Sequence, residues 1–275
     1  MLFLQMKYHL KYIYLYQRKS YLLSFFVYIL YNLLNLNLIL SKLDKYLINS
    51  NIASRVNKGI NYSRYLLWKY LNKVRENDFY ILKFDIKKYF FNIDHDILLK
   101  LLSKYLNVDE LLIIKNILDS TNLEYINTKI NYFNNKYNLD LPRYSLNKGL
   151  SIGSVCSQML AVFYLNEFDH FIKEKLNCKY YIRYMDDGII IDNDKERLKK
   201  VFNVLKKLIK KYKLEFNNKT RIYNSRCGFN FLGIYYYVIN KRIIKRISKR
   251  NKKKIIKKIN YNNYKFYKNY LKYIK

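Results

Sequence analysis

RYMDDGIIID, residues 183–192, decides how this sequence folds. Two adjacent aspartates, Asp186 and Asp187, separate two runs of strand-forming residues, KYYIRYM (179–185) and GIIID (188–192). This pattern predicts a β-hairpin with the acidic pair at its tip. Adjacent aspartates often serve only as turn formers or helix caps. Each carboxylate also raises the cost of ionising the other, so a bound cation is the alternative explanation.

Other patterns place this hairpin in an α+β fold. FYILKFD (79–85) is an apolar run of strand length, and an apolar stripe from Ile97 to Tyr105 predicts a helix capped by Asp94 with Asp96 in its first turn. Further helices are predicted over 109–118, 154–176 and 194–212, and further strands over 221–224, 229–239 and 242–247. This order of elements predicts an antiparallel sheet covered by helices.

Asp85 ends the first predicted strand and gives the acidic pair a possible partner. If the strands are neighbours, Asp85, Asp186 and Asp187 meet at one edge of the sheet. Carboxylate oxygens are the ligands that Mg²⁺ prefers, and two or three of them suffice because the ion keeps waters or substrate phosphates. Two such ions about 3.5–4 Å apart can promote phosphoryl transfer. Asp85 alone would equally suit a turn cap.

The charge of the chain favours a polyanionic partner. Its 275 residues include 53 Lys plus Arg against 20 Asp plus Glu, a net charge of +33. Nucleic acid or an anionic membrane fits this charge better than small neutral substrates do. The abundance of Lys, Asn, Ile and Tyr is also what AT-rich coding produces, so the charge only supports the argument. Three widely spaced cysteines suggest neither a disulfide framework nor a zinc site, and a reducing cytoplasm is the expected location.

YLLSFFVYILYNLLNLNLIL (21–40) carries no charged residue and is long enough for a membrane-spanning helix. Asn32, Asn35 and Asn37 interrupt it and favour a buried or amphipathic helix instead. We therefore expect no stable membrane contact, and keep a membrane-associated basic protein as an alternative.

Four dispersed motifs together resemble the palm of reverse transcriptases. They are FDIKKYF (84–90), GLSIGSVCSQ (149–158), YMDD (184–187) and FLG (231–233), in this order. Within that family the chain is most similar to bacterial enzymes of diversity-generating retroelements and their group II intron-like relatives, because Ile152, Gly153, Ser157 and Gln158 follow the pattern IGxxxSQ. The resemblance covers about residues 50–245.

The resemblance implies a role for each matching residue in the active site. Asp85, Asp186 and Asp187 would hold two Mg²⁺ ions, or Mn²⁺, and Lys219 would protonate the departing pyrophosphate. The nucleotide site would comprise Ile86, Phe90, Ile152, Gly153 and Gln158, with Phe90 excluding a 2′-hydroxyl. The alternatives are a core aromatic role for Phe90, which its place beside Asp85 disfavours, and a solvated surface role for Lys219.

Six further residues would contact template or primer by the same resemblance: Arg55, Lys58, Ser157, Phe231, Leu232 and Gly233. Phe231 and Leu232 would grip the primer end, although both also suit a strand in the core. The basic, aromatic segment 245–275 fits a grip on a phosphate backbone, with a solvated tail as the alternative.

The resemblance also implies a division of the chain. Residues 1–50 would be a helical, partial fingers region, 51–238 the palm with the remaining fingers, and 239–275 a short thumb-like or nucleic-acid-binding tail. No basic PxKxR-like segment precedes residue 55, so we expect an N-terminally truncated enzyme. Gly188 stands where relatives commonly have a bulky apolar residue, and Phe91 where many have Asp.

The expected function is RNA-directed DNA polymerase activity. The partners would be an RNA template, a DNA or RNA primer and deoxynucleoside triphosphates. The alternative is a catalytically inactive, nucleic-acid-binding remnant of the same fold.

Overall fold

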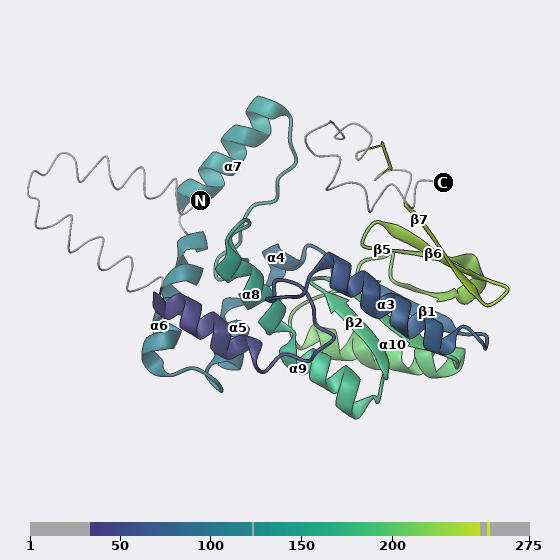
Figure 1. Ribbon diagram of the computed structural model, residues 1–275. Helices are drawn as coiled ribbons and strands as arrows, with labels where there is room; N and C mark the ends of the chain where they lie inside the picture. Colours follow the sequence, from purple (N-terminus) through teal and green to yellow (C-terminus); the bar gives the residue numbers. More distant parts are fainter. Residues whose placement is uncertain (1–33, 123, 248–251, 254–275) are drawn as a thin grey trace, which may run out of the picture.

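A four-stranded antiparallel sheet forms the centre of the molecule in a computed structural model that describes residues 34–122, 124–247 and 252–253 (Figure 1). The strand order is β2-β3-β1-β4. The bounds are β1 (Tyr80–Asp85), β2 (Tyr180–Tyr184), β3 (Asp187–Asp192) and β4 (Arg221–Asn224). β2 and β3 form the predicted hairpin, and β1 pairs with β3, so the two strand ends that carry the aspartates are neighbours. The α+β class is confirmed.

A second sheet of three strands has the order β5-β6-β7. Its bounds are β5 (Phe229–Phe231), β6 (Ile234–Ile239) and β7 (Arg242–Ile247). The single strand predicted over 229–239 is wrong in one detail. Leu232 and Gly233, with φ of 48° and 82°, make a two-residue turn that splits it into β5 and β6. Positive φ at both central residues is typical of the tight hairpin turn whose twist matches that of the strands.

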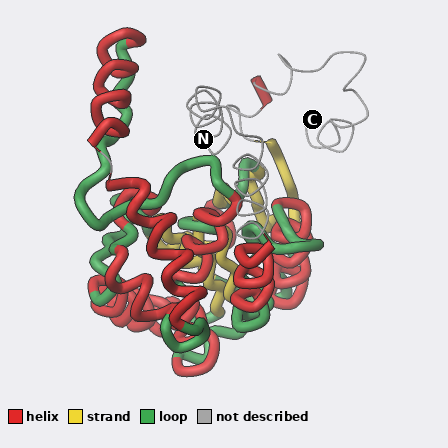
Figure 2. The backbone as a smooth tube through the Cα atoms, turned by 90° about the vertical axis from the view of Figure 1, so that its left-hand side faces the viewer, coloured by secondary structure: helices red, strands yellow, loops and turns green. Residues whose placement is uncertain are grey.

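Helices surround the strands (Figure 2). Residues 34–44 are helical, and the further helices are α3 (Ile60–Val74), α4 (Tyr89–Asn92), α5 (His95–Leu102), α6 (Val108–Asp119), α7 (Glu124–Tyr137), α8 (Val155–Tyr164), α9 (Asn166–His170) and α10 (Lys195–Lys210). Short 3₁₀ turns lie at Ser120–Asn122 and Ser225–Cys227, and a π-helical turn spans Phe171–Lys175. α7 stands out from the body of the molecule (Figures 1 and 2).

The two faces of the central sheet bury separate cores because strand side chains alternate between faces. Leu82, Phe84 and Ile190 point into a core shared with α5, α8, α9 and α10. Ile81 and Ile189 point into a second core shared with α3, β5 and β6. Both faces are therefore covered, which explains why β1 and β3 are nearly continuous apolar runs rather than alternating ones.

Local signals explain where several helices begin. The Asp94 carboxylate accepts a hydrogen bond from the Ile97 backbone at 3.1 Å, so the predicted cap of α5 is confirmed. Asn107 and Glu110 form a reciprocal capping box at α6. Asp194 caps α10 by accepting hydrogen bonds from two backbone N–H groups. Each such cap stabilises its helix by about 1 kcal/mol.

The long helix predicted over 154–176 is wrong, because the segment is divided into α8, α9 and the π-helical turn. α8 ends at Tyr164, and the φ of −104° and ψ of 20° at the next residue, Leu165, are not helical. Two buried polar residues, Asn166 and Asp169, follow this break. An apolar stripe alone gives no warning of buried polar groups whose partners lie on other elements.

α3 and α7 were not predicted individually. In α7, Asn127 and Asn134 each exchange two hydrogen bonds with the backbone of the returning segment, at Tyr144 and Leu141. These bonds fasten an extended segment along the projecting helix.

Within the described residues, no helix is long and apolar enough to cross a membrane. The structure does not describe residues 1–33, 248–251 and 254–275. Most of segment 21–40 and most of the predicted basic tail therefore lie outside the described residues.

Candidate active site

The tip of the β2–β3 hairpin presents the acidic pair. Tyr184 lies opposite Asp187, so Met185 and Asp186 form a two-residue turn. Met185 has φ of 55°, a left-handed conformation that costs energy for a residue with a side chain. The Arg183 guanidinium donates a hydrogen bond of 2.8 Å to the Met185 carbonyl and so helps to hold this turn.

Asp85 lies directly opposite Asp187 in the pairing of β1 with β3. Residues separated by about one hundred positions in the sequence therefore share one sheet edge. Asp85 also interacts electrostatically with both members of the pair. The structure brings the three predicted acidic residues together at the level of the backbone.

Burial shapes the charge of these carboxyl groups. Burial, followed by the nearby charges of Asp85 and Asp187, raises the pKa of Asp186 to about 6. Burial also raises the pKa of Asp187, although Lys83 opposes the rise with an ion pair of 3.2 Å between its Nζ and Asp187 Oδ1. Of the adjacent pair, Asp187 therefore has a lysine partner that compensates part of its negative charge.

The site suits a hard divalent cation in its chemistry. Asp85 and Asp186 offer carboxylate oxygens and repel each other, so a cation between them would relieve the repulsion. Asp187 is directed towards Lys83. In the part of the chain that the structure describes, no three His, Cys, Asp or Glu side chains converge closely enough to form a metal site.

A buried polar network supports the hairpin from behind. Arg183 and Asp169, both with fully buried side chains, form an ion pair with Nε–Oδ1 and Nη2–Oδ2 distances of 2.7 Å. Tyr181 and Asn51 also donate to the Asp169 carboxylate, at 2.6 and 2.9 Å. The network therefore joins three parts of the chain, α9, β2 and the segment at Asn51, and Arg183 connects it to the Met185 carbonyl.

The loop 214–220 holds the end of β1. The Asn217 N–H donates to the Asp85 carbonyl at 2.7 Å, and the Thr220 hydroxyl accepts from the Asp85 N–H at 3.2 Å. Ile86 bridges to Phe216 in the same loop, and its side chain is buried. Lys219 is exposed in this loop. Lys219, the predicted proton donor, therefore lies on a segment that is hydrogen-bonded directly to Asp85.

The predicted nucleotide residues lie on two adjacent segments. Phe90, half-buried in α4, accepts a hydrogen bond from the Leu150 N–H at its carbonyl at 2.8 Å. Ile152, two residues after Leu150, is 60% exposed, and Gly153 has φ of 100°. Gln158 in α8 accepts a hydrogen bond from the Ser54 hydroxyl at 2.8 Å. Phe90 and the loop containing Ile152 are thus joined by the backbone.

Arg55, predicted to contact template or primer, holds the local fold. Its guanidinium donates to the Asp44 carboxylate and to the carbonyls of Asp44, Ile48 and Asn51, and its side chain is only 8% exposed. Lys58 donates to the Asn49 carbonyl at 3.0 Å. Both side chains thus bind the segment 44–51 that leads to the Asp169 network.

The other predicted template and primer residues are divided between core and turn. Ser157 is buried, and its hydroxyl lies 2.9 Å from that of Ser151. Phe231 is fully buried in the second core, whereas Leu232 and Gly233 form the turn. The Arg64 guanidinium donates to the Leu232 carbonyl at 2.6 Å, so α3 fixes this turn.

Sequence reasoning missed the residues that position the site, chiefly Arg183, Asp169, Lys83 and Arg64. Arg183 carries a signal that could have revealed it, because it is a charged residue in the middle of the strand-like run KYYIRYM, whose other charge, Lys179, lies at its start. Asp169 is likewise an acid within an apolar helical segment. Neither signal identifies the partner, because the pairing depends on how α9 packs against β2.

Comparison with known proteins gives one family and one group of structures. Residues 31–236 match the sequence model of a family described as reverse transcriptase (RNA-dependent DNA polymerase). Among solved structures, apo telomerase from Candida tropicalis, truncated from its C-terminal domain, is similar with a TM-score of 0.54 at 16% identity; the match covers 85% of this chain and 50% of that one.

Two telomerase structures determined with a TWJ fragment of telomeric RNA are also similar. The one from Candida tropicalis has a TM-score of 0.52 at 17% identity, covering 84% of this chain and 40% of that one. The one from Candida albicans has a TM-score of 0.51 at 17% identity, covering 78% and 37%. This chain thus corresponds to half or less of each telomerase chain. No curated protein matches it.

Proposed function

Because the chain belongs to the reverse transcriptase family, which its residues 31–236 match, we propose that it is an RNA-directed DNA polymerase. It would add deoxynucleotides to the 3′-hydroxyl of a DNA or RNA primer on an RNA template. The single observation that carries this proposal is the register of β1 and β3, which sets Asp85 opposite Asp187 beside the turn that presents Asp186.

Asp85, Asp186 and Asp187 are the residues that would hold Mg²⁺ or Mn²⁺. Two bound ions would supply activation of the attacking hydroxyl and neutralisation of the leaving oxygen. The raised pKa of Asp186 supports this assignment, because burial and like charges make its ionised form costly without a cation.

The chain's own residues would orient the substrates. Arg183 holds the Met185 carbonyl and thereby the direction of the turn that carries Asp186. Phe90, joined to the loop before Ile152, would stand beneath the sugar of the incoming nucleotide. Lys219 would donate a proton from Nζ to the departing pyrophosphate, since its loop is bonded to Asp85. Ile152, Gly153 and Gln158 would lie near the nucleotide, and Leu232 and Gly233 near template or primer.

Primer extension on an RNA template with Mg²⁺ tests the proposal. We expect extension by the wild type and none by the double variant Asp186→Ala plus Asp187→Ala. Asp140→Ala removes an exposed carboxylate far along the chain and should extend like the wild type. Equal activity in the double variant and the wild type would refute the proposed mechanism. Salt-sensitive RNA binding without extension in any variant would instead favour an inactive, nucleic-acid-binding relative.

A further inference from the structure

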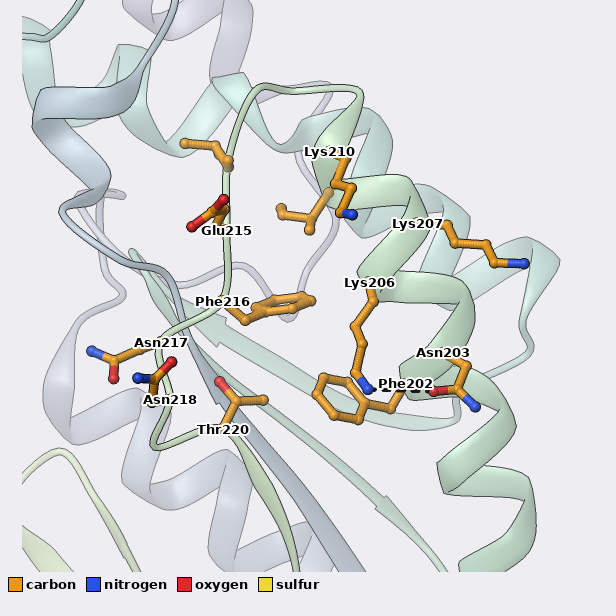
Figure 3. A pocket seen from close by; sticks show the side chains of 12 residues that line it. Phe202, Asn203, Lys206, Lys207, Lys210, Glu215, Phe216, Asn217, Asn218 and Thr220 are labelled. Carbon is orange, nitrogen blue, oxygen red and sulfur yellow. Dashed lines mark hydrogen bonds between the residues drawn. The ribbon is translucent and has the colours of Figure 1, made fainter.

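A cavity of about 760 Å³ that is open to solvent lies between α10 and the loop 214–220. Figure 3 shows side chains from both segments facing the space. Its size lies within the range of small-molecule sites, about 300–1,000 Å³. All of its walls belong to described residues.

Two lysines supply positive charge to the cavity. Lys206 and Lys210 are four residues apart on α10 and therefore share one helix face. Both extend towards the space in Figure 3. Lys206 Nζ lies 4.3 Å from the centroid of the Phe202 ring and 3.4 Å from Asn203 Oδ1. Within the described residues neither lysine makes an ion pair with a carboxylate, so both charges are available to an anion.

Both sides of the cavity carry an aromatic ring, Phe202 on α10 and Phe216 on the loop, and the loop adds amide groups. The rings of Phe202 and Phe216 are half-buried, with centroids 5.8 Å apart. Asn217 and Asn218 follow on the loop. Glu215 is the one acidic residue in the lining, and its carboxylate lies 4.0 Å from Lys87. Two aromatic rings, tilted by 49° to one another, beside two cations suit a ligand with both an aromatic ring and phosphate groups.

We propose that this cavity binds a phosphorylated nucleoside, with phosphate on Lys206 and Lys210 and the base against Phe202 and Phe216. The site lies next to the acidic sheet edge but uses none of its three carboxylates, and it needs no metal. The same chemistry is offered by a free nucleotide and by one unit of a single strand. Because the Asn217 N–H is bonded to the Asp85 carbonyl, the ligand would rest on the segment that fixes the end of β1.

Equilibrium binding of fluorescently labelled dATP in EDTA tests the proposal. Chelation leaves Asp85, Asp186 and Asp187 unscreened, so triphosphate binding at the acidic edge is suppressed. We expect the double variant Lys206→Gln plus Lys210→Gln to bind at least about tenfold more weakly than the wild type, a loss of about 1.4 kcal/mol.

The matched control is Lys199→Gln plus Lys200→Gln, two turns earlier on the same helix and outside the cavity lining. It removes the same charge from a chain of +33 and should keep wild-type affinity. Equal affinities of the two double variants would overturn the proposal, because attraction to the overall charge would then explain binding. A labelled oligo(dT) strand and pyrophosphate, measured in parallel, distinguish a strand, a free nucleotide and a bare phosphate site.

A second variant keeps the test decisive if the lysine substitutions disturb folding. Asn218 is exposed at the cavity rim, and Asn218→Asp adds a negative charge without removing packing. We expect it also to weaken dATP binding, and unchanged affinity in this folded variant would count against the site. Because these measurements report binding alone, they are independent of whether the chain extends primers.

Discussion

Ionisation of Asp186 is unfavourable because this carboxyl group is largely buried and lies beside two other carboxylates. Burial and the charges of Asp85 and Asp187 raise its pKa to about 6, from an ordinary value of 3.8. The unfolded chain therefore releases this proton at lower pH than the folded chain does. The contribution of Asp186 to stability is most favourable below about pH 4 and is lost as the pH rises through about 6.

We expect Asp186→Asn to stabilise the metal-free protein at pH 8 by about 1–2 kcal/mol, less than the full pKa shift implies because the side chain is partly exposed. The advantage should vanish near pH 4, where wild-type Asp186 is protonated. Urea unfolding in EDTA at both pH values measures this difference. The same gain at pH 4 and pH 8 would show that the ionised carboxylate is not its cause.

The pair of Arg183 and Asp169 illustrates a different residue-scale effect. Both side chains are fully buried, so removal of one partner leaves an uncompensated charge in the core. We expect Arg183→Met to lower the free energy of unfolding by about 3–5 kcal/mol. Arg226→Met, which breaks the exposed pair with Asp78, is the matched control and should have a much smaller effect. Similar losses in both variants, measured by urea unfolding, would contradict this assignment.

Strands β1 and β3 pack closely at Gly188, where the ring of Phe84 on β1 covers the glycine on β3. The family resemblance predicts a bulky apolar residue here, yet Phe84 lies directly opposite Gly188 in the register. A Cβ atom at position 188 would lie 2.0 Å from the Phe84 ring. The ring of Phe84 therefore fills the space that a side chain on β3 would otherwise occupy, which explains the departure from the family pattern.

We expect Gly188→Ala to destabilise the protein by about 1–3 kcal/mol through overpacking, since position 188 has no positive φ that would strain alanine. In a Phe84→Leu background the same substitution should cost much less. Thermal or urea unfolding of the four proteins in this double-mutant cycle gives the coupling energy. If the changes in unfolding free energy of the two single variants simply add in the double variant, the Phe84 ring is not the cause of the cost of Gly188→Ala.

Other elements show what local patterns can predict. The caps of α5 and α10 depend on residues adjacent to the helix, and the sequence predicts both helices closely. The apolar pattern predicts neither the break at Leu165 nor the turn at Leu232–Gly233, because an apolar run does not reveal where the backbone must bend. α7 has only one buried residue, so it lacked the apolar stripe by which the other helices were recognised.

For the whole molecule, the net charge of +33 implies salt-dependent binding to nucleic acid. We expect the affinity for a primed RNA template to fall by about 10- to 1,000-fold between 50 and 200 mM KCl, as counterion release predicts for several phosphate contacts. Fluorescence anisotropy measures this dependence. An affinity independent of salt would exclude a phosphate-backbone grip by the basic surface.

The α+β class, the hairpin with its acidic tip and the reverse transcriptase family could all be predicted from the sequence alone. Strand periodicity, turn residues and short motifs are local properties and need no knowledge of packing. The similarity to bacterial retroelement enzymes, the division into domains and the cytoplasmic location stay predictions. Three features became visible only in the folded chain. Arg55 and Arg183 form ion pairs with Asp44 and Asp169, Asp187 pairs with Lys83, and the ring of Phe84 leaves no room for a side chain at Gly188. These pairings join residues on different elements, and their energies depend on burial, which arises only when the sheet and helices pack together.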